Sequence, residues 1–290
     1  MTRARAIRGK PNPAAMSVVG SERDLAVLET LAWAGILRTG QIETLFFKTR
    51  RRAQRRMRAL LDHGLVRSHR QGEALHREDV FTLAPKGMAL LETKGAFPDG
   101  PPKPARLPRI SKLAHALAIR DVFVAFLAAE HTGSSRLVDF RFEEDLAREP
   151  AFRAARLVPD AVGVVEADGR SSSFAVEVDL GTETSTTLRG KLEAWARFHV
   201  GGAGQRFAAL LVVADADSRA RLLWRLASEA QLGTWATVVP VAGLPALVGC
   251  RWPHTCAVPP RRAERRGNGL DEADFKPAGD GRTAAFRPLS

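Results

Sequence analysis

The chain contains no tyrosine among its 290 residues. Relaxases, tyrosine recombinases and the common topoisomerases hold a cut DNA strand through a phosphotyrosine, and this covalent step needs a phenol as the nucleophile. The absence of tyrosine therefore excludes that class of mechanism.

Cysteine and long apolar runs are scarce as well. Only Cys250 and Cys256 occur, so a disulfide framework is not available and a reducing compartment is expected. Apolar runs such as FAALLVVA at 207–214 are too short to cross a bilayer. The basic start MTRARAIRGKPNPAAM lacks the apolar segment of a secretory signal. We therefore expect a cytoplasmic protein without membrane contact.

The positive charge of the chain, which totals +12, is concentrated at one end. Residues 1–97 hold 18 Lys and Arg against 9 Asp and Glu, whereas residues 98–256 hold 19 against 18. A concentrated basic excess is typical of proteins that bind a polyanion such as nucleic acid. We therefore expect the polyanion to bind the first third of the chain.

The length of the chain suits two modest domains. A segment rich in proline, PDGPPKPARLP, is incompatible with a helix and separates two regions of apolar periodicity. The expected organisation is a flexible basic arm (1–20), a first domain (21–97), a linker (98–108), a second domain (109–256) and a disordered tail (257–290).

The first domain is predicted to be a winged helix-turn-helix. Helical spacing of apolar residues predicts three helices, in 21–35, 37–47 and 49–64, with Ser21 and Thr49 as N-caps and Gly64 as the end of the third helix. Two short strands follow around the polar turn QGEALHRED, and the segment PKGMALLETKG is a closing helix. This order is that of a winged helix that binds double-stranded DNA.

The third predicted helix is dominated by arginine. Ala53, Met57, Leu60 and Leu61 form its buried stripe, so the arginines must occupy the remaining surface. The major groove of duplex DNA accepts such a helix, with arginine contacting both phosphates and guanine edges. The alternative is a solvated basic helix on a surface that binds another protein. The predicted DNA contacts are Arg50, Arg51, Arg52, Arg55, Arg56 and Arg58 in the helix, and Arg67, Arg70 and Arg77 beside the wing.

The second domain is predicted to be an α/β domain. A long helix at 110–131 precedes three strands, of which the last two form a hairpin through a turn at Asp168 and Gly169. A helix at 183–199, a buried strand, another helix and a last strand follow. The order is αβββαβ and then αβ, around a central mixed sheet, which makes the whole chain α+β.

Acidic residues occur together in the predicted hairpin. Glu177 and Asp179 share one face of a strand because side chains alternate along it, and Asp160 lies where hairpin pairing brings it opposite them. Three carboxylates on one face repel each other unless a cation or protons compensate, and hard oxygen ligands favour Mg²⁺ or Mn²⁺. The alternative is a solvated strand face whose acids pair with Arg189 or Lys191.

These motifs carry a resemblance to known families. The dipeptide at 159–160 and the segment EVD at 177–179, inside an αβββαβ order, resemble the PD-(D/E)xK nuclease superfamily. The whole arrangement, with LAHALAIRD, VPDA, FAVEVDLGTET and KLEAWARF after the predicted winged helix, is similar to the replication-relaxation family, which is linked to plasmid replication and DNA relaxation.

The resemblance implies roles for individual residues. In the nuclease superfamily the two acids bind the metal and a lysine two residues after the second acid activates water, so Asp160 and Glu177 match the acids. Asp179 stands where that lysine is expected, so the chain departs from the pattern there, and Lys191 in the next helix is the candidate for a displaced ammonium. His115, in LAHALAIRD, is more typical of packing or capping, but the resemblance keeps it as a possible neighbour of the site.

Three functions remain open from the sequence. The first is duplex DNA binding in plasmid or mobile-element replication, relaxation or mobilisation, with a replication or mobilisation protein, or a second copy of the chain, as partner. The second is Mg²⁺-dependent hydrolysis of DNA, with Asp160, Glu177, Asp179 and Lys191 as catalytic residues. The third is transcriptional regulation through the winged helix.

Overall fold

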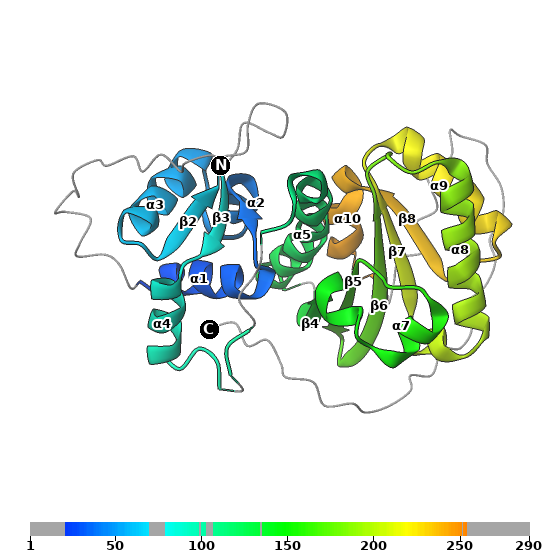
Figure 1. Cartoon of the computed structure of the whole chain (residues 1–290), viewed down its shortest axis with the longest axis horizontal. Coiled ribbons are helices and arrows are strands. Elements are labelled where there is room, and N and C mark those ends of the chain that lie inside the picture. Colours follow the sequence, from blue (N-terminus) through cyan, green and yellow to red (C-terminus); the bar gives the residue numbers. More distant parts are fainter. Residues whose placement is uncertain are drawn as a thin grey trace. The chain divides into compact units, whose positions relative to one another are not determined.

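The computed structural model describes residues 21–69, 79–98, 100–102, 107–133, 135–250 and 252–253. The chain divides into two compact units between Leu113 and Ala114 (Figure 1). The predicted arm at 1–20, the tail at 257–290 and most of the predicted wing turn lie outside the described residues. Within the described residues, no helix is long and apolar enough to cross a membrane.

The N-terminal unit begins with the predicted series of helices. Ser21 caps the first of them, since its hydroxyl accepts a hydrogen bond from the Asp24 amide at 3.3 Å. Thr49 occupies the predicted N-cap position of the third helix without a side-chain hydrogen bond, and Gly64, with φ +70°, follows the end of that helix. The elements are α1 (Glu22–Ala34), β1 (Leu37–Arg38), α2 (Thr39–Phe46), α3 (Arg50–Asp62), β2 (Val66–His69), β3 (Val80–Leu83) and α4 (Pro85–Thr93).

A small antiparallel sheet completes this unit. Its strand order is β1-β3-β2, so both predicted strands are present and β1 pairs with the free edge of β3. The prediction that the second helix begins at residue 37 is wrong, because the backbone of Leu37 pairs with Phe81 and the helix begins only at Thr39.

The C-terminal unit is built around a five-stranded mixed sheet of order β4-β5-β6-β7-β8. The pairs β4–β5 and β5–β6 are antiparallel, whereas β6–β7 and β7–β8 are parallel. The predicted mixed α/β architecture is thus confirmed. The elements are α5 (Ile110–His131), β4 (Arg136–Phe142), α6 (Glu143–Leu146), α7 (Pro150–Ala155), β5 (Ala161–Ala167), β6 (Arg170–Asp179), α8 (Ser185–Val200), η2 (Ala203–Arg206), β7 (Ala209–Ala214), α9 (Asp217–Glu229), β8 (Ala236–Pro240), η3 (Val241–Gly243) and α10 (Leu244–Gly249).

The predicted hairpin is formed by β5 and β6. Its turn consists of Asp168 and Gly169, with φ 51° and 75°. Positive φ at both central residues is the geometry that a two-residue turn needs to match the twist of its strands. The register of the hairpin places Ala161 opposite Val176 and Gly163 opposite Phe174.

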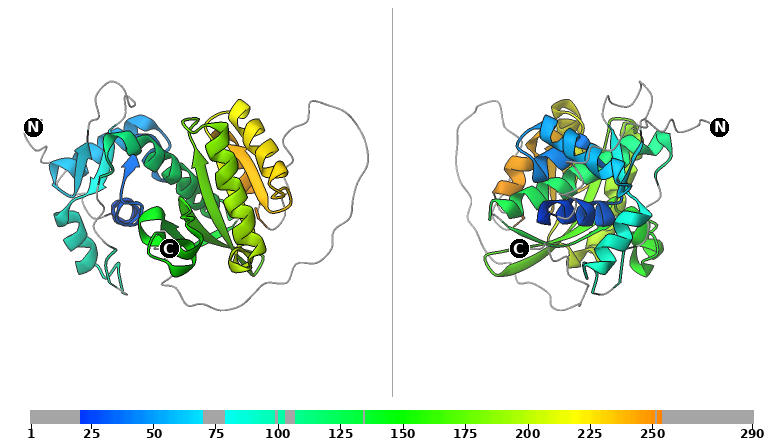
Figure 2. Two further views of the ribbon diagram at one scale, coloured as in Figure 1. Left: turned by 45° about the vertical axis from the view of Figure 1, so that its right-hand side comes forward. Right: turned by 90° about the vertical axis from the view of Figure 1, so that its left-hand side faces the viewer.

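Helices cover both faces of the five-stranded sheet. Figures 1 and 2 show α8 and α9 side by side on one face, while Figure 1 shows α5 and α10 on the other. On the α5 face the ring of Phe126 stacks on Phe174 at a centroid distance of 4.6 Å. The Phe174 ring also lies over Gly163, where an added Cβ would meet it at 2.3 Å. The α8 face holds a separate core that includes Trp195, so the sheet is buried on both sides.

Candidate functional site

The acidic residues meet at one edge of the mixed sheet. Because β6 and β7 are parallel, their carboxyl ends lie at the same edge, and β5 begins there because it runs antiparallel to β6. Asp160 directly precedes β5, and Glu177 and Asp179 end β6. In open α/β sheets this edge is where ligands commonly bind.

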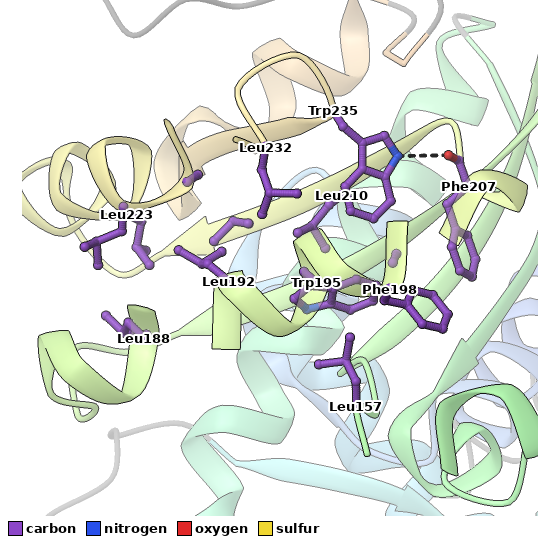
Figure 3. Close-up of a cluster of buried hydrophobic side chains, with 14 of the residues drawn as sticks. Leu157, Leu188, Leu192, Trp195, Phe198, Phe207, Leu210, Leu223, Leu232 and Trp235 are labelled. Atoms are coloured by element: carbon purple, nitrogen blue, oxygen red, sulfur yellow. Dashed lines mark hydrogen bonds between the residues drawn. The ribbon is translucent and has the colours of Figure 1, made fainter. Parts of the chain in front are cut away.

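Glu177 points to the α8 side of the sheet. Its strand neighbour Ala175 belongs to the hydrophobic core beneath α8, and residues two apart on a strand share a face. The indole Nε1 of Trp195 donates to Glu177 Oε1 at 2.8 Å, and the ammonium of Lys191 forms an ion pair with Oε2. Figure 3 shows Trp195 within this core, beside Leu192 and Phe198 of the same helix. The carboxylate therefore enters an apolar core and is held there by one N–H donor and one cation.

Asp160 lies beside Glu177 and is held by other partners. Its Oδ1 contacts His115 Nε2 of α5 at 3.0 Å, and its Oδ2 accepts a hydrogen bond from the backbone N–H of Val178 at 2.7 Å. Since Asp160 is 7% exposed and Glu177 is 4% exposed, both carboxylates are largely removed from water.

Four ionisable groups in this network perturb one another. Burial raises the pKa of Glu177 to about 7, although the charge of Lys191 opposes the rise. Burial also disfavours the charged form of Asp160, but the hydrogen bond from His115 and the charge of Lys191 outweigh it and hold the pKa of Asp160 below its usual range. The same hydrogen bond raises the pKa of His115, and Glu177 and Asp160 together raise the pKa of Lys191 against the effect of its burial.

Asp179 is engaged away from this network. The guanidinium of Arg219, from α9, forms an ion pair with it through both carboxylate oxygens, one of these contacts being 3.2 Å from Nη2 to Oδ1. Arg219 also donates to the carbonyl of Glu183 at 2.6 Å, which ties the start of α9 to the loop before α8. Asp179 thus has a structural partner of its own.

The alternative of a solvated strand face is wrong, because Glu177 and Asp179 are both buried. The pairing with Lys191 that this alternative included is present. Arg189, the other basic residue proposed there, pairs with Glu229 of α9 instead.

The described carboxylates do not form the predicted three-acid metal site. Asp160 and Glu177 come together as expected, but Asp179 is bound to Arg219, and all four oxygens of the other two acids already contact a donor or a cation. Among the residues that the structure describes, no group of three or more His, Cys, Asp or Glu side chains is arranged to hold a metal ion. As arranged, the site does not fit Mg²⁺ or Mn²⁺.

A second candidate site is the outer surface of α3. Ala53, Met57 and Leu60 are fully buried, as predicted, whereas Leu61, the fourth residue of the predicted stripe, is only half-buried; Arg51 and Arg55 lie on the opposite side of the helix. Arg51, Arg52 and Arg55 are exposed, and no ion pair involves them within the described part of the chain. The other predicted contacts on this helix are half-buried, namely Arg50, Arg56 and Arg58.

Two arginines of α3 have acidic partners within the unit. Arg56 forms a two-point ion pair with Asp24 of α1, a residue that is 1% exposed. Arg58 pairs with Asp62 one turn further along α3, at 2.9 Å. Arg67 is exposed on β2, whereas Arg70 and Arg77 lie outside the described residues.

Three partners of the acidic residues do not follow from the sequence. His115 is more typical of packing or capping, and only its place in LAHALAIRD marks it as a possible neighbour of the site. Trp195 lies four residues after Lys191 and so shares its helix face, a signal that was present in the spacing. Arg219 reaches Asp179 from 40 residues away, and no local pattern marks it.

Comparison with known proteins supports the resemblance. No curated protein and no solved structure matches the chain. The family model described as Replication-relaxation matches residues 28–213, which is more than half of the chain and spans most of the elements above. The chain therefore belongs to the replication-relaxation family.

Proposed function

We propose that this protein binds duplex DNA through its N-terminal unit, which acts as a winged helix with α3 as the helix that enters the major groove. The observation that carries the proposal is the exposed arginine surface of α3, formed by Arg51, Arg52 and Arg55. Arginine on such a surface suits both the phosphate backbone and guanine edges.

The division of the arginines on α3 supports the proposal. Arg56 and Arg58 are neutralised within the unit, by Asp24 and Asp62, and so contribute little to an external field. The exposed arginines lack such partners among the described residues, and their mutual repulsion is relieved when an anion binds. Arg67 on β2 extends the exposed basic surface to the strand that leads into the wing.

The C-terminal unit is proposed to be a nuclease-like platform rather than the source of DNA affinity. Its elements α5, β4, β5, β6, α8 and β7 follow the αβββαβ order of the PD-(D/E)xK superfamily, with the short helices α6 and α7 inserted before β5. Membership of the replication-relaxation family favours a role in plasmid or mobile-element replication, relaxation or mobilisation. The proposed partners are a replication or mobilisation protein and a second copy of this chain.

The test is the salt dependence of DNA binding. We expect R52A/R55A to weaken binding to duplex DNA and to lower the slope of log K against log salt concentration by roughly 2, because each phosphate contact contributes about 0.9 to that slope. Fluorescence anisotropy with a labelled duplex at several salt concentrations measures both quantities.

R221A/R225A is the matched control, because these two arginines are exposed at i, i+4 spacing on α9 of the other unit. It removes the same charge and should leave affinity and slope close to those of the wild type. Equal losses in both double variants would show a nonspecific effect of net charge, and an unchanged R52A/R55A would remove α3 from DNA binding.

A further inference from the structure

Lys191 lies where several carboxylates converge. Its ammonium forms an ion pair with Glu177, and the charges of Asp160 and Glu183 stabilise it as well. One oxygen of Glu183 is buried and has no hydrogen-bond partner within the described residues. The lysine side chain is only 30% exposed, so its charge is held largely away from water.

Asp160 and Glu177 are already in contact with donors or cations, although Oε2 of Glu177 has only its ion pair with Lys191 and no regular hydrogen bond among the described residues. Each oxygen of Asp160 and Glu177 already contacts His115, Lys191, the Trp195 indole or a backbone N–H. A divalent ion entering the site would have to displace the ammonium or bind next to it, and two cations a few ångströms apart repel each other strongly in a buried site.

Burial makes the ammonium hard to replace. The side chain of Glu177 is 6% exposed and projects into the core beneath α8, so without the ammonium its carboxylate would have to take up a proton or another cation.

We propose that the ammonium of Lys191 is the built-in cation of the Asp160–Glu177 site and takes the place that a divalent metal ion would occupy. The wild-type protein therefore binds neither Mg²⁺ nor Mn²⁺ at this edge of the sheet. Loss of the ammonium, with the carboxylates retained, creates a divalent-cation site.

Mn²⁺ is the probe that tests this proposal, because electron paramagnetic resonance counts free and bound Mn²⁺ directly. We expect the wild type to show no Mn²⁺ binding that depends on Glu177, and K191M to bind Mn²⁺ at least tenfold tighter than the wild type. By mass action, Mn²⁺ should then raise the melting temperature of K191M alone.

Two control variants separate the charge of Lys191 from its shape. K191R keeps a cation and should remain without Mn²⁺ binding, whereas K191M/E177Q lacks one carboxylate and should lose the binding that K191M gains.

Either of two results would overturn the proposal. One is Mn²⁺ binding by the wild type that E177Q abolishes; the other is a folded K191M that does not bind Mn²⁺. If K191M folds only in the presence of Mn²⁺, the result supports the proposal. If K191M does not fold at all, the Mn²⁺ titrations of wild type and E177Q test the proposal: binding by the wild type that E177Q abolishes overturns it, and no such binding supports it.

Discussion

The imidazole of His115 is a direct reporter of charge at the candidate site. Its contact with Asp160 raises its pKa above the usual 6.5, while burial acts in the opposite direction. In D160N the carboxylate charge is gone and burial remains, so we expect the pKa of His115 to fall below 6.5. A pH titration followed by NMR of the histidine ring protons measures the change.

The contact between His115 and Asp160 also makes the stability of the fold depend on pH. The folded-state pKa of His115 is raised, so its stabilising contribution is present below pH 6.5 and is lost as the pH rises through the folded-state value. D160N should weaken this dependence, and the other histidines should titrate as in the wild type. An unchanged pKa of His115 in D160N would show that the contact with Asp160 does not control its protonation.

The sequence predicts the acidic network only in part. The closeness of Asp160 and Glu177 follows from the alternation of side chains and the register of the hairpin. Helical spacing makes Lys191 a candidate to reach these acids from the next helix. Alternation also predicts that Asp179 joins them, because it shares a strand face with Glu177. Asp179 instead pairs with Arg219 of α9. This pair depends on where α9 packs against the sheet, and local periodicity does not predict the packing position of a helix.

The helices α1 and α3 are tied together by the ion pair between Asp24 and Arg56. Asp24 is almost completely buried, and R56A removes the two-point ion pair that its carboxylate makes with the guanidinium of α3. We expect R56A to lower the local stability of α1 and α3 by about 3 kcal/mol. Native-state hydrogen exchange of the amides in these helices measures the loss locally.

R55A is the matched control on the same helix, because Arg55 is exposed and should cost less than about 0.5 kcal/mol. The double variant D24A/R56A removes both charges and should be less destabilised than R56A. Similar values for R56A and R55A would show that the ion pair contributes little, and Arg56 would then be available to DNA.

The longer elements could be predicted because their apolar residues follow the helical or strand period over a sufficient length. Several short elements could not, although the four-residue strands β2 and β3 could. The two residues of β1 owe their strand conformation to pairing with β3, a contact made across more than 40 residues, and α6 and α7 are too short to show a period. Elements without a local apolar period or a turn signal beside them therefore could not be predicted from the sequence.

On the scale of the whole molecule, the basic and the acidic sites lie in different compact units. Substitutions at the acidic site should therefore change any reaction there without changing the affinity for DNA. If the ammonium of Lys191, which pairs with Glu177, takes the place of a divalent ion as proposed above, supercoiled plasmid should remain intact with the wild type and Mg²⁺ or Mn²⁺.

Gel electrophoresis of the plasmid, with wild type and E177A compared at equal DNA occupancy, makes this test. Nicking by the wild type that E177A lacks would identify a metal-dependent nuclease and would contradict the proposed role of Lys191. Equal, intact plasmid in both samples favours a platform that binds without cutting.

Gly163 and Phe174 face each other across the hairpin, and the phenyl ring fills the space that a side chain at 163 would need. Neither position can therefore change size alone without loss of packing. Among relatives of this chain, we expect the two positions to vary together, with a larger residue at 163 accompanied by a smaller one at 174. Such paired variation would record the register of the hairpin in the family's sequences, and with it the placement of Asp160 beside Glu177.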